Sequence, residues 1–301
     1  MFKAYLATLL ALVSGAALGF KAQAETSPKH ILVIGCDGMG SIAFTASNAP
    51  TMHRLMREGA YTLRARGVMP TSSSPNWASM IMGSGPEQHG VTSNEWETNR
   101  FQFSALETGP EGLFPTIFRV VREQKPSSSI YCVHDWDGFG RLVEKRAANL
   151  VTNVLGSTNT AAYAARVIEE KKPTFLFVHF DMVDHAGHGH GWVTPEYFDA
   201  VEGADKLIAQ LIASLEKAGI AKDTLVLITA DHGGVGTKHG GLTMEELEIP
   251  WIVWGAGVVR GHVIKSPVNT FDTAASLAYV LKLTPPSVWI GKPVKEAFTL
   301  R

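Results

Sequence analysis

The stretch ILVIGCDGMG, residues 31–40, predicts a buried strand that ends in a carboxylate. Its first residues form a continuous aliphatic and mostly β-branched run, which is typical of a strand covered on both faces. Asp37 follows in a turn with Gly38 and Gly40, so its side chain is expected at the carboxyl end of this strand. Ligands of open α/β sheets bind at that edge. The stretch therefore predicts the middle of an α/β sheet with an acidic group at its ligand-binding edge.

Strand-like and helix-like segments alternate along the rest of the chain. Further strands are expected over residues 61–68, 129–134, 174–180, 224–229 and 249–254, and helices over residues 50–58, 116–124, 159–170, 195–218 and 271–281. This alternation predicts an α/β fold with a largely parallel central sheet and helices on both faces. A loop rich in glycine and histidine is expected after Asp181, and residues 95–112 form a polar segment to which the pattern assigns no role.

The first 24 residues have the pattern of a cleaved signal peptide. Lys3 supplies a positive charge, an apolar stretch covers residues 5–18, and Ala22-Gln23-Ala24 is a small-residue cleavage site. Serine and glycine interrupt the apolar stretch, which is short for a membrane span, although a retained anchor is the alternative. We therefore expect a secreted or periplasmic protein without a stable membrane anchor. Residues 25–301 have the length of one large α/β domain.

Composition narrows the class of protein further. The 27 basic and 28 acidic residues give a formal net charge of −1, whereas a nucleic-acid-binding surface needs a basic face. No nucleic-acid partner is therefore expected, and no oligomeric state is predicted.

Cys36 and Cys132 both end predicted strands that could be neighbours, so a disulfide and two buried thiols both remain open.

The stretch PTSSSPNW, residues 70–77, predicts a helix N-terminus that carries hydroxyl groups. Pro75 suits the first turn of a helix, where its missing N–H costs nothing. Ser73 and Ser74 would then lie where free backbone N–H groups favour an anion. A hydroxyl held there could attack phosphorus once its proton is removed. The alternative is an ordinary Ser/Pro turn that caps a helix.

Acidic and histidine residues follow three predicted strands. These residues are Asp37, Asp184 with His188, and Asp231 with His232, and His239 lies shortly downstream. Carboxylates and imidazoles that converge at one sheet edge are the groups a two-metal hydrolytic site needs, and the imidazoles favour zinc over harder ions. A metal-binding protein without catalysis is the alternative, because it would need the same Asp and His residues but not Ser73.

In their order and spacing, these motifs resemble those of the alkaline phosphatase superfamily, specifically its nucleotide pyrophosphatase/phosphodiesterase-like branch. The matching positions are Asp37, residues 70–76, residues 83–90, Asn94, residues 184–188, residues 231–233 and His239. The resemblance spans most of the chain. It implies an alkaline phosphatase-like sandwich and an enzyme that hydrolyses small-molecule phosphoric esters.

The resemblance also implies a role for each matching residue. Ser73 takes the position of the nucleophile, which would form a phosphoserine intermediate, and Asn94 would bind a non-bridging phosphoryl oxygen together with the Ser74 N–H. One zinc ion would be held by Asp37, Ser73, Asp231 and His232, and the other by Asp184, His188 and His239. Three further histidines match no ligand position and are expected behind the ligands or at the surface: His179, His185 and His190.

Two features leave the substrate open. Ser74 and His179 occupy the positions at which nucleotide-cleaving members of the branch carry base-stacking aromatic residues, and the possible substitutes are Trp77, Trp96 and Trp136. The ligand carboxylates and a serine alkoxide would balance the charge of two divalent ions, which favours a singly charged diester. An alkaline phosphomonoesterase is the alternative, and it would want a further cation such as Arg141 or Lys238.

Overall fold

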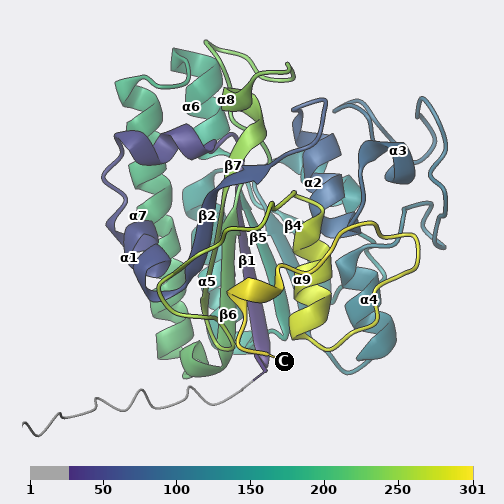
Figure 1. Cartoon of the computed structure of the whole chain (residues 1–301). Coiled ribbons are helices and arrows are strands. Elements are labelled where there is room, and N and C mark those ends of the chain that lie inside the picture. Colours follow the sequence, from purple (N-terminus) through teal and green to yellow (C-terminus); the bar gives the residue numbers. More distant parts are fainter. Residues whose placement is uncertain (1–26, 301) are drawn as a thin grey trace, which may run out of the picture.

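The computed structural model describes residues 27–300, which form one eight-stranded sheet with helices on both faces (Figure 1). The strand order is β4-β3-β5-β1-β6-β7-β2-β8, and β7 alone runs antiparallel to its neighbours. The strands are β1 His30–Cys36, β2 Ala60–Arg66, β3 Ile130–His134, β4 Leu150–Asn153, β5 Phe175–Phe180, β6 Thr224–Thr229, β7 Glu248–Gly255 and β8 His262–Val263. The prediction of a mostly parallel sheet flanked by helices is confirmed.

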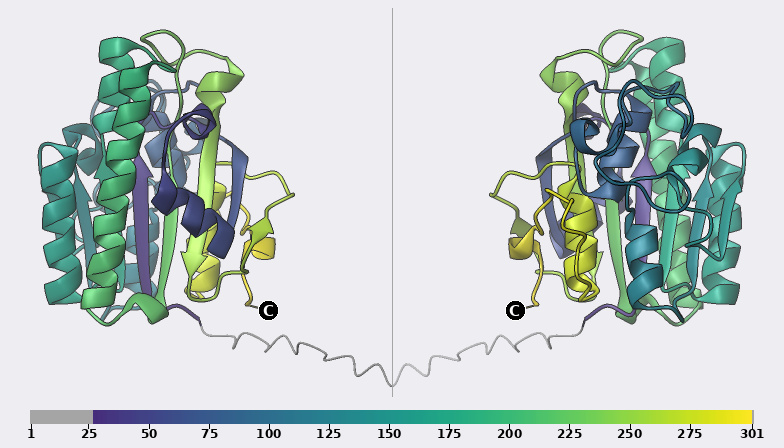
Figure 2. Two further views of the ribbon diagram at one scale, coloured as in Figure 1. Left: turned by 90° about the vertical axis from the view of Figure 1, so that its left-hand side faces the viewer. Right: turned by 90° about the vertical axis from the view of Figure 1, so that its right-hand side faces the viewer.

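Two layers of helices enclose the sheet. The helices are α1 Pro50–Glu58, α2 Ser73–Met82, α3 Pro86–His89, α4 Ile117–Gln124, α5 Ser157–Lys171, α6 Met182–His190, α7 Pro195–Lys217, α8 Met244–Leu247 and α9 Asp272–Val280, with 3-10 turns at Ser41–Thr45, Asp137–Leu142, Ala221–Asp223 and Lys295–Ala297. The two views of Figure 2 show α1, α5 and α7 on one face and α2, α4 and α9 on the other. None of the helices within residues 27–300 is both long and apolar enough to cross a membrane. The predicted signal peptide lies outside the described residues.

The three central strands set the position of the site. β1 pairs in parallel with β5 on one side and with β6 on the other, and Ile34 lies opposite both Val178 and Ile228. All three strands are almost completely buried, as their aliphatic sequences predict. Because they are neighbours and run in the same direction, their carboxyl ends meet at one place on the sheet edge. The residues that follow them are therefore brought together.

One expectation about local structure is wrong, two strands were not predicted, and the structure decides between the two alternatives for the cysteines. The segment after Asp181 is the helix α6 and not a loop, because its tertiary packing overrides the low helix propensity of its glycines. Gly187 lies so close to Trp192 that a Cβ would come within 2.6 Å of the indole. β4 and β8 are short strands at the two ends of the sheet, where partial exposure removes the hydrophobic signal. β5 separates β1 from β3, so Cys36 and Cys132 are not on neighbouring strands. Both are buried free thiols, and burial raises the pKa of each.

His89 ties the loop after α2 back to that helix. Its Nδ1 accepts a hydrogen bond from the Val91 N–H at 3.0 Å, so its Nε2 carries the hydrogen and donates to the Ser79 hydroxyl at 2.9 Å. The Ser79 hydroxyl donates in turn to the Pro75 carbonyl at 2.8 Å. His89 is 1% exposed, and burial lowers its pKa to about 3. The native state therefore holds a neutral imidazole at this position.

We expect His89 to make the protein less stable in acid. A histidine with an ordinary pKa near 6.5 in the unfolded chain and about 3 in the native state contributes no penalty above pH 6.5. Below pH 6.5 it reduces the free energy of unfolding by about 1.4 kcal/mol for each pH unit, until the native group also titrates. Urea unfolding of the wild type and His89→Gln between pH 8 and pH 4.5 measures this. The difference in the free energy of unfolding between the wild type and His89→Gln should change by about 1.4 kcal/mol per pH unit below pH 6.5. A difference that does not depend on pH would contradict the prediction.

Candidate active site

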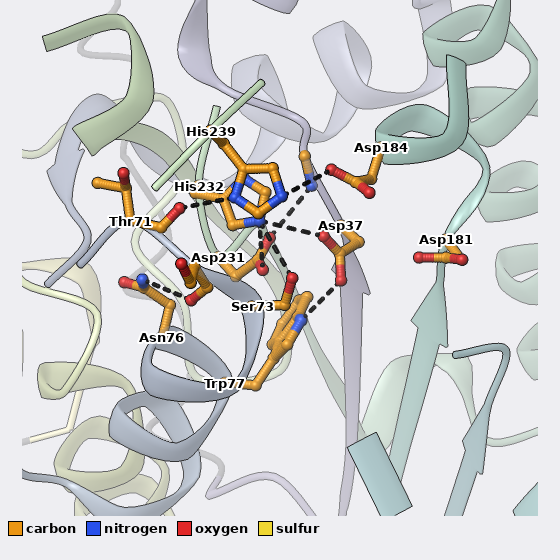
Figure 3. Close-up of polar contacts among 12 residues, drawn as sticks. Asp37, Thr71, Ser73, Asn76, Trp77, Asp181, Asp184, Asp231, His232 and His239 are labelled. Carbon is orange, nitrogen blue, oxygen red and sulfur yellow. Dashed lines mark hydrogen bonds and ion pairs between the residues drawn. The ribbon is translucent and has the colours of Figure 1, made fainter. Parts of the chain in front are cut away.

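The ends of the three central strands carry the acidic residues that the sequence singles out (Figure 3). Asp37 directly follows β1, and Asp231 lies two residues after β6. Asp184 and His188 are both on α6, and their spacing of four residues puts them on the same side of the helix. His239 comes from the loop between β6 and α8. The structure thus gathers residues from four separate segments at one sheet edge.

His232 lies in the middle of a first group of oxygen atoms. Its Nε2 is 3.4 Å from Asp37 Oδ1, 3.2 Å from Asp231 Oδ2 and 3.3 Å from Ser73 Oγ. Its Nδ1 is 2.8 Å from the Gly233 carbonyl, which can only accept, so the ring hydrogen is on Nδ1. Nε2 therefore turns a bare lone pair toward two carboxylates and a hydroxyl. This is the arrangement of atoms around a bound cation.

Asp184 lies between the two other histidines in a second group. His188 Nε2 is 3.4 Å from Asp184 Oδ2, and His239 Nε2 is 3.8 Å from Asp184 Oδ1. The Nδ1 atoms of the two rings are each 2.9 Å from a backbone carbonyl, of Thr237 and Thr71 respectively. Their Nε2 atoms are therefore also free of hydrogen. The two groups are adjacent, because the rings of His232 and His239 stack with centroids 3.8 Å apart.

The electrostatics of both groups are those of a cation site. Three carboxylate oxygens are buried without a hydrogen-bond partner among the described residues: Asp37 Oδ1, Asp184 Oδ1 and Asp231 Oδ2. Burial raises the pKa of Asp37 and Asp231 well above the usual value and that of Asp184 to about 9, and it lowers the pKa of His239 to about 3. An unpaired buried polar atom costs about 1–3 kcal/mol, and a charged one more. Divalent cations would remove that cost, so these residues fit metal ions.

Ser73 is the first residue of α2 and is 5% exposed. The turn before it is held by Asn76, whose Oδ1 accepts from the Val68 N–H at 2.6 Å and whose Nδ2 donates to the carbonyls of Pro70 and Ser72 at 3.1 and 2.9 Å. Asn76 therefore fixes where the hydroxyl points. Sequence reasoning assigned no role to this residue, and its place inside the PTSSSPN motif was the signal that could have found it.

Asn94 is hydrogen-bonded to Ser74, the residue after Ser73, and this bond contradicts one expectation. Its Oδ1 accepts from the Ser74 N–H at 2.8 Å, so that N–H is not free to bind a phosphoryl oxygen as predicted. The same bond leaves the amide NH2 of Asn94 as the group that can face the cavity. Arg141 braces this arrangement, because it donates to Ser74 Oγ at 3.0 Å and to the Asn94 carbonyl.

The remaining residues that the sequence singled out are either exposed, buried, or placed at the edge of the site. His185 and His190 are exposed on α6, and Lys238 is exposed in the loop before His239. His179 is buried and contacts Asp37 at 3.1 Å. Trp77 and Trp96 are buried, at 0% and 5% exposure, so neither is free to stack on a substrate. Trp136 is half-buried and is the tryptophan of the three that lines the site.

A cavity of about 290 Å³ opens onto these groups and is lined by Ser73, Asn94, Trp136 and the acidic and histidine residues Asp37, Asp184, His188 and His239. A second cavity of about 720 Å³ shares Trp136, Asp181 and His185 with the first. The two together offer room for a phosphoryl group and for a larger substituent beside it. A separate groove of about 660 Å³ along β2 contains none of these residues.

The sequence and the fold both have relatives among known proteins. The sequence model of the type I phosphodiesterase / nucleotide pyrophosphatase family matches residues 31–254. Ectonucleotide pyrophosphatase/phosphodiesterase family member 1 of Mus musculus is 24% identical over 196 residues, which are 61% of this chain and 21% of that protein. This chain spans about a fifth to a third of the length of the first curated relatives that it matches.

Two solved structures share the fold at low sequence identity. Human ectonucleotide pyrophosphatase/phosphodiesterase 5 superimposes with a TM-score of 0.75 at 14% identity, over 90% of this chain and 100% of the other. A variant of the alkaline phosphatase PafA superimposes with a TM-score of 0.77 at 14% identity, over 92% of this chain and 100% of the other. At this identity the likeness shows a common fold only. The match to the family over residues 31–254, however, covers most of the chain, which therefore belongs to the type I phosphodiesterase / nucleotide pyrophosphatase family.

Proposed function

We propose that this protein is a phosphodiesterase that uses two zinc ions and the Ser73 hydroxyl to hydrolyse small phosphoric esters. One observation carries the proposal: three histidines turn hydrogen-free Nε2 atoms toward carboxylate oxygens, beside a serine at a helix N-terminus. A structural hydrogen-bond network would instead pair each carboxylate with a donor. Membership of the family supports the same reaction class.

Each residue has a distinct role in this proposal. Asp37, Asp231, His232 and the Ser73 hydroxyl would hold one ion, and Asp184, His188 and His239 would hold the other. When bound, the ions would lower the pKa of the serine hydroxyl and neutralise charge on the phosphoryl oxygens. Ser73 would then attack phosphorus and displace one alcohol or phenol, giving a phosphorylated serine that still carries the other ester group. Water would cleave the bond between this phosphorus and Ser73, releasing a phosphate monoester and restoring the serine hydroxyl. The Asn94 amide would donate to a non-bridging oxygen, and Asn76 would keep Ser73 in place.

A diester is the preferred substrate in this proposal. The cavity is lined mainly by carboxylates and histidines, and the arginine that contacts the neighbouring Ser74 and Asn94 is already engaged. Arg141 pairs with Glu97 at 3.3 Å and bonds to Ser74 and Asn94, so it braces the site and does not supply a free cation for a dianionic monoester. The adjoining cavity beside Trp136 leaves space for the second ester group.

The test compares two chromogenic substrates. Purified protein should hydrolyse bis(4-nitrophenyl) phosphate with a higher kcat/KM than 4-nitrophenyl phosphate, and a chelator should abolish both activities until zinc is restored. Preference for the monoester would make the protein a phosphomonoesterase on the same site. Metal binding without turnover of either ester would leave a metal-binding protein, and the proposed function would be wrong.

Asn94→Ala is expected to reduce kcat for the diester by about 10²–10³-fold, which is the usual cost of losing one oxyanion donor. Zinc content should be unchanged, because Asn94 is not among the proposed ligands. Ser93→Ala, a change in the preceding residue, is the matched control and should retain wild-type kcat. A loss of less than about threefold in Asn94→Ala would show that this amide does not bind the phosphoryl group.

We also propose that residues 25–301 act as one catalytic domain after removal of residues 1–24 on export. All eight strands described belong to one sheet, which supports a single unit. N-terminal sequencing of exported protein tests the cleavage. A chain that begins at Met1 would contradict it.

A further inference from the structure

The two carboxylate oxygens of Asp37 have different surroundings. Oδ2 accepts a hydrogen bond from Trp77 Nε1 at 2.9 Å and lies 3.1 Å from His179 Nε2. Oδ1 is buried and has no hydrogen-bond partner among the described residues. It lies 3.4 Å from His232 Nε2, which carries no hydrogen (Figure 3). One oxygen is thus held by two ring nitrogens, and the other faces the proposed metal.

The hydrogen of His179 is placed differently from those of the proposed ligand histidines. In His188, His232 and His239 a backbone carbonyl fixes the hydrogen on Nδ1. His179 Nδ1 is buried and has no partner among the described residues, so the hydrogen is free to lie on Nε2. With its hydrogen on Nε2, His179 donates to Asp37 Oδ2 across 3.1 Å, and that nitrogen then has no lone pair for a metal.

Both donor rings are immobilised by packing. Trp77 is completely buried, and it lies so close to β1 that a Cβ on Gly35 would come within 2.5 Å of its ring. His179 is 0% exposed, with the rings of Trp77 and Phe139 at centroid distances of 5.0 and 5.2 Å. Neither donor can leave Asp37 without disturbing the core. This explains why a glycine stands at position 35 inside an otherwise aliphatic strand.

We propose that His179 and Trp77 are positioning residues that hold Asp37 Oδ2, so that only Oδ1 is presented to the metal. The proposal rests on the proposed function, in which Asp37 is a metal ligand. Trp77 adds a second consequence, because it lies on α2 one turn after Ser73. The same indole therefore joins the helix that carries the nucleophile to the carboxylate that binds the ion.

Loss of either donor should weaken metal binding without removing a ligand. Hydrogen-bond partners behind a metal ligand typically contribute 10–100-fold in metal affinity. His179→Phe keeps a buried ring but loses the donor, and Trp77→Phe does the same at the other position. His179→Gln keeps an N–H donor at the distance of Nε2 and should restore much of the affinity. Because both donors share one oxygen, the double variant should lose less affinity than the product of the two single losses.

The experiment is a zinc titration of the chelator-stripped protein against a chromophoric chelator, which measures both the number of ions and their dissociation constants. We expect two ions in every variant. The dissociation constant of one ion should rise about 10–100-fold in His179→Phe and in Trp77→Phe. In His179→Gln it should stay within about threefold of the wild-type value. His190→Ala removes an exposed histidine of α6 and is the matched control, with wild-type affinity expected. Near-ultraviolet circular dichroism of each stripped protein verifies the fold, and Trp77→Phe tests the proposal independently if His179→Phe does not fold.

Three other results of the zinc titration would each lead to a different conclusion. Wild-type zinc affinity in folded His179→Phe and Trp77→Phe would overturn the positioning role and leave the proposed function intact. A wild type that binds three ions, and a His179→Phe variant that binds two, would make His179 a ligand together with Asp37 and Asp181, whose side chains are close enough for this. A wild type that binds no zinc would overturn the proposed function itself.

Discussion

Replacing Ser73 by alanine is expected to abolish hydrolysis of phosphate diesters while leaving the fold intact. Ser73 Oγ is the hydroxyl that lies beside His232 Nε2, at 3.3 Å, and the side chain makes no other hydrogen bond among the described residues. The alanine variant should lose about 10⁴-fold or more in kcat, because it lacks the hydroxyl that is proposed to attack phosphorus. Ser73→Thr should keep much of the activity, since the hydroxyl remains.

The measurement is the rate of 4-nitrophenol release from bis(4-nitrophenyl) phosphate at saturating zinc. Ser72→Ala is the matched control, because it removes a neighbouring hydroxyl that caps no helix N–H, and its kcat should be close to wild type. Trapping the wild type with radiolabelled substrate in acid should yield labelled Ser73. If Ser73→Ala retained substantial turnover with normal zinc content, water would be the nucleophile and the phosphoserine would not form.

Loss of a proposed ligand from either group should remove metal and activity together. Asp231→Asn replaces a carboxylate that is buried 3.2 Å from His232 Nε2, and His239→Ala removes one of the two imidazoles around Asp184. Each variant should bind about one zinc ion fewer than wild type and lose about 10³-fold or more in kcat/KM, because the proposed reaction would need cations both to lower the pKa of the Ser73 hydroxyl and to neutralise charge on the phosphoryl oxygens.

Metal analysis by mass spectrometry and the diester assay measure the two effects. His190→Ala serves as the control, because it removes a histidine from the same helix as His188 that belongs to neither group of proposed ligands. It should keep two ions and full activity. Full zinc content in both Asp231→Asn and His239→Ala would show that these residues do not hold the metals.

Metal removal should also lower stability. Ions that bind only the native state stabilise it, and at a free concentration 100 times the dissociation constant each contributes about 2.7 kcal/mol. A chelator should therefore lower the melting temperature of the wild type by more than that of Asp231→Asn, which is expected to lack one ion. Equal melting-temperature shifts for the two proteins would contradict this assignment.

The class of fold and the approximate place of the site follow from the amino-acid sequence alone. Runs such as residues 31–35 and 224–229 are aliphatic almost throughout, and a strand buried on both faces demands this composition. Because the strands are parallel, residues that follow them must share one edge, and this reasoning places Asp37 and Asp231 there. The short strands β4 and β8 and the helix α6 were missed, because partial exposure and glycine remove the periodic signal on which such predictions depend.

Which atom of a side chain faces which neighbour is a property of the folded chain. Backbone carbonyls of Thr71, Gly233 and Thr237 fix the hydrogens of three histidines, and two of these carbonyls come from segments that only folding brings close. The resemblance set His179 apart from the metal ligands, but the sequence could not show that its Nε2 lies 3.1 Å from Asp37 Oδ2. Nor could it show that the Ser74 N–H is already paired with Asn94. Spacing along a chain sets which residues can meet, whereas tautomer, orientation and burial arise from packing between strands and helices that are distant in sequence.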